Sequence, residues 1–136
     1  MTGRCLCGNV SYTTESEPLI VAICHCNNCQ RQTGTAYSLV VGVPRAGFSI
    51  AGATLAEFET TTESTGTPSQ RRFCSNCGSA LVTFAEAAPD LALIKAGTLD
   101  DQHGLSPAVE VHCQSAFAFA VAEDAGRARF PADLPA

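Results

Sequence analysis

The chain has 136 residues, of which 46% are hydrophobic, so it is long enough to form one domain with a buried core over residues 1–136. No segment approaches the roughly 18 apolar residues of a membrane-spanning helix, and the first residues lack the apolar region of a secretory signal. The formal net charge of -5, without a basic patch, argues against nucleic-acid binding. These features favour a cytoplasmic protein, in which clustered cysteines bind metal or carry redox chemistry rather than form disulfides.

The first half of the chain predicts short strands separated by turn residues. Residues 10–14 alternate apolar and polar, as a half-buried strand does. The apolar run 19–23 is short and rich in β-branched residues, which predicts a buried strand leading directly into Cys24. Further strands are expected at 37–43, 48–50 and 54–60.

One short helix is expected after the central cysteines, because Asn27 or Asn28 can cap its first turn. The helix should run to about Gln32 and end at Gly34, since glycine commonly follows the last turn of a helix. Residues 61–69 are mostly Thr, Ser, Gly and Pro, which predicts a loop.

The second half predicts more strands and a loose end. Gly78 follows Cys77 and permits the positive φ of a metal-binding cysteine turn. The tail 127–136 is rich in Pro and Ala and is expected to fray. Strands are expected at 81–84, 91–96 and 109–112, and residues 115–121 suit either a strand or a short helix. Many short strands separated by turns, with no long linker, indicate a mainly β domain.

Seven of the 8 cysteines lie in three tight clusters. Cys5 and Cys7 form one pair, and Cys74 and Cys77 form another at a distant point of the chain. Zinc prefers four tetrahedral ligands, and thiolates are favoured in structural sites. The two pairs therefore predict a closed four-thiolate site, the alternative being four cysteines buried as small apolar side chains.

The remaining cluster, Cys24, Cys26 and Cys29, lacks an obvious fourth cysteine. Three protein ligands and one exchangeable position are typical of a catalytic zinc, which polarises carbonyls or stabilises a thiolate. Two alternatives stay open: a redox-active C-x-x-C without metal, and a second structural site completed by a histidine. The open metal site is the favoured interpretation.

Several single residues are weaker candidates. His25 lies between two predicted ligands, so its side chain should point away from their metal, either as a supporting donor or at the surface. His112 is interpreted as a structural histidine and His103 as solvated. Cys113 is interpreted as a plain buried cysteine, although the fold could bring it to a metal site. Arg31 and Arg72 carry planar guanidinium groups suited to a carboxylate, or are solvated charges.

The sequence resembles the glutathione-dependent formaldehyde-activating enzyme family, which includes centromere protein V-like proteins, over nearly the whole chain. The motifs that carry the resemblance are G-x-C-x-C-G-x-V-x-Y at 3–12, C-H-C-x-x-C-x-R-x-T-G-T at 24–35, R-F-C-x-x-C-G-S at 72–79 and G-T-L-D at 97–100. The order and spacing of the three cysteine clusters make the resemblance specific.

The resemblance implies a β-tent, in which several antiparallel sheets fold over each other around zinc. It implies two zinc ions per chain, of which the second is expected to be more labile. The structural zinc would be held by Cys5, Cys7, Cys74 and Cys77, and the catalytic zinc by Cys24, Cys26 and Cys29. The activity implied is the addition of glutathione, or another small thiol, to formaldehyde or another small aldehyde, formally by a carbon-sulfur lyase.

The substrate residues that the resemblance suggests follow the central cluster. Arg31, Thr33, Gly34 and Thr35 are expected to line the tripeptide site, with backbone donors from the start of the helix and from the 33–35 turn. The chain departs from the family near its end. Relatives usually carry Ser-Lys-Ala-Pro-Trp after a histidine, whereas residues 115–119 here are Ser-Ala-Phe-Ala-Phe, so the substrate can differ.

The alternative function is a zinc-stabilised, non-catalytic module that binds another protein, a use to which the same fold is also put. It predicts bound zinc without turnover and an exposed apolar patch. A thiol redox enzyme that uses Cys26 and Cys29 is a further alternative and predicts a reversible disulfide. The sequence indicates neither the oligomeric state nor the natural substrate.

Overall fold

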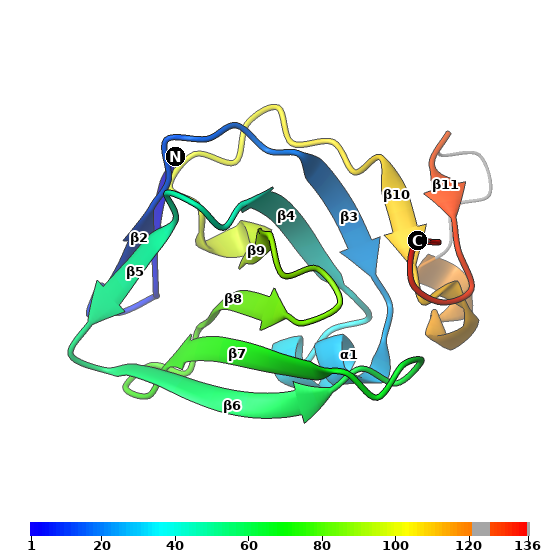
Figure 1. Cartoon of the computed structure of the whole chain (residues 1–136), viewed down its shortest axis with the longest axis horizontal. Helices are drawn as coiled ribbons and strands as arrows, with labels where there is room; N and C mark the ends of the chain where they lie inside the picture. Colours follow the sequence, from blue (N-terminus) through cyan, green and yellow to red (C-terminus); the bar gives the residue numbers. More distant parts are fainter. Residues whose placement is uncertain (121–125, 136) are drawn as a thin grey trace.

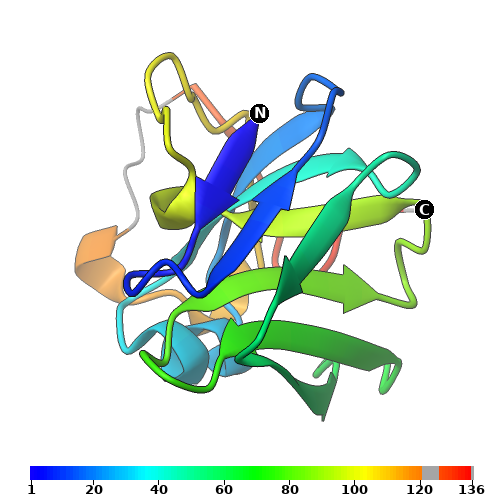
Figure 2. The same cartoon turned by 90° about the vertical axis from the view of Figure 1, so that its left-hand side faces the viewer.

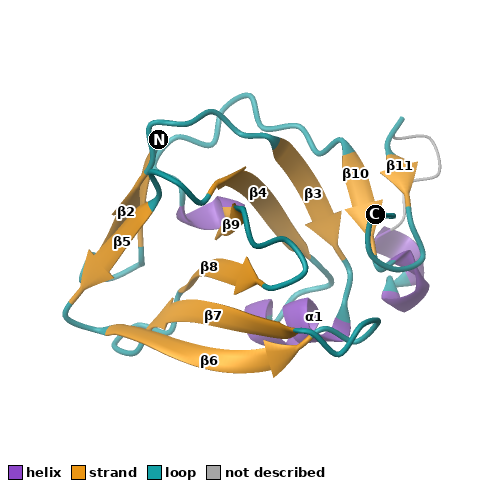
Figure 3. Cartoon of the chain, in the orientation of Figure 1, coloured by secondary structure: helices purple, strands orange, loops and turns teal. Residues whose placement is uncertain are grey.

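The computed structural model describes residues 1–120 and 126–135, and the described chain is mainly β with one α-helix (Figure 3). The helix is α1 (Asn27–Thr33). The strands are β1 (Thr2–Arg4), β2 (Val10–Thr13), β3 (Ile20–Cys24), β4 (Ser38–Pro44), β5 (Ser49–Gly52), β6 (Leu55–Thr61), β7 (Pro68–Cys74), β8 (Ala80–Ala85), β9 (Leu91–Lys95), β10 (Val109–Val111) and β11 (Ala128–Arg129). Three short 3-10 turns are η1 (Ala96–Thr98), η2 (Cys113–Ser115) and η3 (Ala118–Ala120).

The strands form two sheets. A small sheet has the order β1-β2-β5, and a large sheet has the order β11-β10-β3-β4-β9-β8-β7-β6. Figure 1 shows the large sheet bending from β3 at the upper right to β6 at the bottom, with the small sheet at the left. In the turned view of Figure 2, the small sheet stands in front of the large one. The mainly β prediction is confirmed, but the pairing is not antiparallel throughout, because β10 runs parallel to both β3 and β11.

The core lies where the two sheets meet. Val41 and Val43 of β4, Leu81 of β8 and Ile94 of β9 have no exposed surface, and Val10 of β2 joins them from the small sheet. The alternation of apolar residues along these strands directs one row of side chains inward. The run at 19–23 is less buried than predicted: only Ile23 is buried, and Leu19 is 67% exposed.

The start of helix α1 holds two of the central cysteines together, and Gly34 ends the helix. Its first residue follows Cys26, whose Sγ accepts a hydrogen bond from Cys29 N at 3.3 Å. The prediction that Asn27 or Asn28 caps the helix was therefore wrong, because the cysteine sulfur takes that role. The predicted end is confirmed, since Gly34 adopts the left-handed conformation with φ of 67°.

The structure refines the predictions for two irregular segments. Strands β6 and β7 extend into the predicted loop 61–69, and the connection that remains is 62–67. Residues 115–121 form 3-10 turns rather than a strand as far as Ala120, and Val121 lies outside the described residues.

The tail does not fray over residues 126–135, and Ala136 lies outside the described residues. β11 pairs with β10, and His112 N donates to Ala132 O at 2.9 Å. Composition could not predict that the tail is ordered, because the order depends on ion pairs from Arg127 and Arg129 to the buried carboxylate of Glu110.

Gly52 gives a direct test of the small sheet. It pairs with Val10, and a Cβ at position 52 would lie 2.1 Å from Asn9 O and 2.7 Å from Val10 Cα. Because both atoms belong to backbone, we expect Gly52→Ala to lower the free energy of unfolding by about 1–3 kcal/mol. Urea unfolding checks this, with Gly97→Ala as the control, since nothing lies within 4 Å of a Cβ at position 97. Equal stability of the two variants would contradict the close approach of β5 to β2.

Candidate metal and active site

Four cysteines from two distant turns lie together. Cys5 and Cys7 belong to the turn between β1 and β2, while Cys74 ends β7 and Cys77 lies in the turn that follows it. Their four sulfur atoms lie within 4.8 Å of one another, with 3.6 Å between Cys5 and Cys7 and 3.7 Å between Cys7 and Cys74. Four sulfurs placed tetrahedrally about 2.3 Å from zinc are about 3.8 Å apart. The set therefore has the donor chemistry and the spacing of a closed zinc site.

Neighbouring hydroxyls favour the thiolate form of two cysteines of this set, Cys74 and Cys77. The Thr54 hydroxyl lies 3.1 Å from Cys74 Sγ, and its hydrogen bond lowers the pKa of Cys74. The Ser79 hydroxyl lies 3.2 Å from Cys77 Sγ and lowers the pKa of Cys77 to about 5. Ser79 Oγ also accepts a hydrogen bond from Leu6 N at 3.0 Å, so it joins the two cysteine turns. Because the thiolate is the form that binds metal, these contacts suit metal binding.

The other three clustered cysteines also converge. Cys24 ends β3, Cys26 precedes α1, and Cys29 lies in the first turn of α1. Their sulfur atoms lie within 4.8 Å of one another. The set can hold a metal ion through three sulfurs, which leaves one position of a tetrahedral site for another ligand.

Two buried, positively charged side chains lie close to the sulfur of Cys29. Arg71 Nη1 and Lys95 Nζ each lie 3.9 Å from Cys29 Sγ, and each of these side chains is only 7% exposed. Hydrogen bonds from the thiols of Cys24 and Cys26, followed by the charges of Lys95 and Arg71, hold the pKa of Cys29 well below its usual value. Three thiolates exceed the charge of a divalent ion by one, so the same cations can balance a metal-loaded site.

The register of the large sheet positions Lys95. Cys24 of β3 lies opposite Ser38 of β4, and Val40 of β4 lies opposite Lys95 of β9. Ser38 Oγ accepts a hydrogen bond from Lys95 Nζ at 3.1 Å, so three adjacent strands fix the amine beside the cysteines. Lys95 is the single lysine of the chain.

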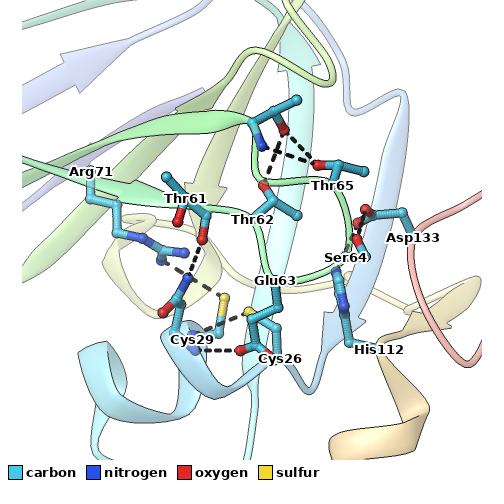
Figure 4. Close-up of polar contacts among 12 residues, drawn as sticks. Cys26, Cys29, Thr61, Thr62, Glu63, Ser64, Thr65, Arg71, His112 and Asp133 are labelled. Carbon is cyan, nitrogen blue, oxygen red and sulfur yellow. Dashed lines mark hydrogen bonds and ion pairs between the residues drawn. The ribbon is translucent and has the colours of Figure 1, made fainter.

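Arg71 is held from two sides. Its Nε donates to Thr60 Oγ1 of β6 and its Nη1 donates to Gln32 Oε1 of α1, each at 2.8 Å. Figure 4 shows the guanidinium extending from β7 toward Cys29. The helix and the β6–β7 hairpin are thereby joined across the three-cysteine set.

The β6–β7 connection is also tied to the start of the helix. Asn28 N donates to Glu63 Oε1 at 3.3 Å, and Asn28 Nδ2 donates to Thr61 O at 2.9 Å. Cys29 N is already bonded to Cys26 Sγ. The N–H groups of Asn28 and Cys29 therefore have protein partners, and the expectation that backbone donors at the start of the helix bind a tripeptide stays a prediction.

Each of the two cations beside Cys29 also lines a hollow, Arg71 the first and Lys95 the second, although no cysteine of the three-cysteine set is among the wall residues. The first has a volume of about 380 Å³ and is lined by Asn28, Arg31, Gln32, Phe58, Thr60, Arg71, Phe73, Gly78 and Ala80. The second has a volume of about 370 Å³ and is lined by Gln32, Thr33, Thr35, Tyr37, Ser38, Leu39, Gly78, Ser79, Ala80, Lys95, Ala96, Gly97 and Thr98. Both walls include Gly78 and Ala80, which follow the last cysteine of the four-cysteine set.

Three of the four predicted substrate residues line these two hollows. Arg31 lines the first, and Thr33 and Thr35 line the second, whereas Gly34 lines neither. Gly34 instead ends α1, and its N–H donates to Gln30 O at 2.8 Å. Thr35 N donates to Thr33 Oγ1 at 3.3 Å, so this backbone donor of the turn is used within the turn itself.

His25 is buried, so its interpretation as a surface histidine was wrong. It has no exposed surface, and its Nε2 lies 3.1 Å from Glu110 Oε2. Glu110 is also fully buried and accepts hydrogen bonds from Arg127 at 2.8 and 2.6 Å, while Arg129 Nε lies 3.6 Å away. No local sequence pattern predicts this cluster, because Glu110 and its arginines come from β10 and the tail.

Cys113 is half-buried and close to this cluster. Its sulfur lies within 4.8 Å of ligand atoms of His25 and Glu110. The Glu110 carboxylate is already bound by Arg127 and His25, which explains the group as an ion-pair cluster. The fold therefore brings Cys113 to His25 and Glu110 rather than to either set of clustered cysteines.

The other candidates have structural surroundings. His112 is buried, as its structural interpretation requires, and its Nε2 lies 2.7 Å from Asp133 Oδ1. Asp133 also accepts a hydrogen bond from Ser64 Oγ (Figure 4). His103 is exposed as predicted. Arg72 pairs with Glu57 at 2.5 Å.

Sequence reasoning missed Arg71 and Lys95. The signal for Arg71 was the two-residue period of β7, which buries Ser69 and Arg71 on one face and leaves Arg72 on the other. The signal for Lys95 was a solitary lysine ending an apolar strand. In each case a charge at an inward position was the clue.

The fold and these centres define a mainly β protein with two cysteine sets that can hold metal ions. The sequence model of the family described as glutathione-dependent formaldehyde-activating enzyme matches residues 1–115. The chain belongs to this family, which supports glutathione-dependent formaldehyde activation at the family level.

One solved structure supports the fold. The crystal structure of a Rhodobacter sphaeroides protein matches 96% of this chain and 99% of its own, with a TM-score of 0.59 at 18% sequence identity. No curated protein matches the chain significantly. Among the described residues, no helix is both long and apolar enough to cross a membrane.

Proposed function

We propose that this protein is a zinc-dependent enzyme that adds the thiol of glutathione, or of a related small thiol, to an aldehyde. The observation that carries the proposal is the three-cysteine set with two buried cations beside it, each of which also lines a hollow. The four other clustered cysteines form a separate, closed set. One centre is suited to hold the fold together, and the other is suited to admit a ligand.

The proposed ligands are the predicted ones. Cys5, Cys7, Cys74 and Cys77 would hold a structural zinc, and Cys24, Cys26 and Cys29 a catalytic zinc. Zinc bound by three thiolates supplies Lewis acidity and an open coordination position. The thiolate ligands require a compartment in which cysteines stay reduced, such as the cytoplasm.

The chain's own residues supply charge and position. Addition joins the sulfur to the carbonyl carbon, breaks the carbonyl π bond and moves the thiol proton to the oxygen. Negative charge therefore passes from sulfur to oxygen beside Cys29. Lys95 and Arg71 are fixed in this region by Ser38, Gln32 and Thr60, so they can stabilise that charge without reorganising.

A carbon-13 NMR experiment tests the function. Labelled formaldehyde and glutathione are mixed with the zinc-loaded protein, and the rate of S-hydroxymethylglutathione formation is measured. We expect the protein to accelerate the exchange and a Cys26→Ser variant to lose the acceleration. An exchange rate unchanged by the intact protein would refute the proposed activity.

The charge of Lys95 gives a sharper prediction. Lys95→Met keeps the length of the side chain but removes the charge beside Cys29. We expect the rate of adduct formation to fall roughly 100-fold, as is usual when one preorganised donor to a developing oxyanion is lost. Zinc content is measured in parallel, and Arg45→Met, at an exposed arginine outside both hollows, is the control. A Lys95→Met rate equal to that of the control would exclude this role.

The protein-binding alternative is supported by one observation. Phe117 and Phe119, whose ring centroids are 5.7 Å apart, are 47% and 81% exposed. They lie beyond the residues that the family model matches. A protein that binds zinc fully but leaves the exchange rate unchanged would favour this alternative.

A further inference from the structure

The two hollows differ in chemistry. The second is bordered largely by hydroxyls and small residues, including Thr33, Thr35, Ser38 and Thr98. These groups suit the amides and carboxylates of a peptide thiol. The first is bordered by Phe58 and Phe73, and Phe58 remains 65% exposed. An aromatic side chain left open at the rim of a hollow suits an apolar ligand.

The first hollow also carries positive charge. Its ionisable wall residues are Arg31 and Arg71, with no acid among them. The whole chain has only 8 basic residues and a net charge of -5, so this is a local concentration of positive charge on an acidic protein. Ion pairs between the described residues occupy Arg4, Arg72, Arg127 and Arg129 but not Arg31.

The two arginines have different tasks. Arg71 is buried and held by Thr60 and Gln32, with its Nη1 at the Cys29 sulfur. Arg31 is exposed, one residue before Gln32 on the same helix. A ligand in the first hollow would thus meet one cation at the cysteine centre and a second at the rim. A planar guanidinium binds a carboxylate through two parallel hydrogen bonds.

We propose that the carbonyl substrate of this protein is an aldehyde with an apolar, aromatic body and a carboxylate, and that it binds in the first hollow. The inference rests on the proposed function and narrows its substrate class. The aldehyde carbon faces Cys29, the body packs against Phe58 and Phe73, and the carboxylate pairs with Arg31. Formaldehyde, the smallest aldehyde, would leave unfilled a volume of about 380 Å³, which lies in the ~300–1,000 Å³ range of sites for drug-sized ligands.

The reaction needs no further reactant. The thiol S–H adds across the carbonyl, so one carbon–sulfur bond forms, the carbon–oxygen π bond breaks, and the proton of the thiol ends on oxygen. The product is a hemithioacetal that keeps the carboxylate. Nothing is oxidised or reduced.

The test uses 4-formylbenzoate, benzaldehyde and formaldehyde with the zinc-loaded full-length chain. Binding of the two aromatic aldehydes is measured by titration calorimetry, and the exchange with glutathione is measured by NMR for all three. We expect 4-formylbenzoate to bind at least about tenfold more tightly than benzaldehyde, because a charge-assisted hydrogen bond is worth about that factor or more. We also expect its exchange to be accelerated more than that of formaldehyde.

Two matched variants locate the carboxylate. Arg31→Met should bring the affinities for 4-formylbenzoate and benzaldehyde to within about twofold, whereas Arg45→Met should keep the tenfold difference. Both arginines are exposed, so neither variant should disturb the core. Equal affinities in the unmodified protein, or an unchanged preference in Arg31→Met, would overturn the inference.

The NMR arm separates this inference from the proposed function. If formaldehyde exchange is accelerated and the acid gives no advantage in binding or rate, the substrate class is wrong and the thiol addition stands. If the acid binds selectively through Arg31 but no aldehyde exchanges faster, the ligand chemistry of the hollow stands and the proposed activity fails.

Discussion

Cys74→Ser should cost the protein both a zinc ion and much of its stability. The four-cysteine set joins turns separated by about half of the chain, and the free energy of metal binding becomes free energy of folding in such sites. We expect a loss of about 3 kcal/mol or more, which corresponds to a fall in the unfolding midpoint of roughly 10 °C for a domain of this size. Zinc per chain and thermal unfolding measure the two effects.

Two further serine variants test whether the centres are independent. Cys26→Ser should lose one zinc per chain, but its unfolding midpoint should fall less than that of Cys74→Ser. The reason is that Cys24, Cys26 and Cys29 are close in sequence, so a metal ion bound to them does not join distant parts of the chain. Cys113→Ser should keep the zinc content of the unmodified protein, because its sulfur lies with His25 and Glu110 instead. A Cys74→Ser protein with normal zinc content and normal stability would contradict a structural role for the four-cysteine set.

Glu110→Gln should be the most destabilising of the substitutions that keep side-chain shape. The carboxylate is fully buried and compensates Arg127 and Arg129 while bonding to His25. Removing one partner of a buried ion pair leaves the remaining charge uncompensated, so we expect a loss of about 3 kcal/mol in urea unfolding. The control is Glu57→Gln at the partly exposed pair with Arg72, where less than about 1 kcal/mol is expected.

The pH dependence of this effect has a definite sign. Burial raises the pKa of Glu110, but hydrogen bonds from Arg127 and His25 outweigh it and lower the pKa below the ordinary value of 4.5. A carboxyl with a lowered folded-state pKa stabilises the protein above its unfolded-state pKa, and this contribution disappears as the pH falls through the folded-state value. The difference in unfolding free energy between the unmodified protein and Glu110→Gln should therefore shrink below about pH 4.5. A difference that stays constant down to pH 3 would assign the effect to the altered hydrogen bonds of the amide rather than to the charge.

The sequence predicted what depends on local pattern. Alternating and apolar runs located most strands, Gly34 marked the end of α1, and cysteine spacing indicated the two sets that the fold brings together. The sets could be predicted because closely spaced cysteines remain neighbours in most folds. Family membership could be predicted for the same reason, since its motifs contain those cysteines.

The rest depends on contacts between distant segments. Lys95 and Arg71 reach Cys29 from β9 and β7, across sequence separations that no local pattern reports. The tail was predicted to fray because its composition is typical of loose ends, yet Arg127 binds a carboxylate buried in β10. A buried charge is recognisable in a sequence only when its partner is known, and here the partners are encoded far apart.

The spacing of the cysteines also sets an order of events during synthesis. The three-cysteine set is complete as soon as residue 29 has been added, whereas the four-cysteine set waits for Cys77. A nascent chain therefore offers its three-cysteine set to metal ions before its four-cysteine set exists. Arg71 and Lys95, which lie beside Cys29 in the folded protein, are translated only later. A metal ion captured early by the three cysteines would lack these two charges, so we expect its affinity to reach the full value only once β7 and β9 have been made.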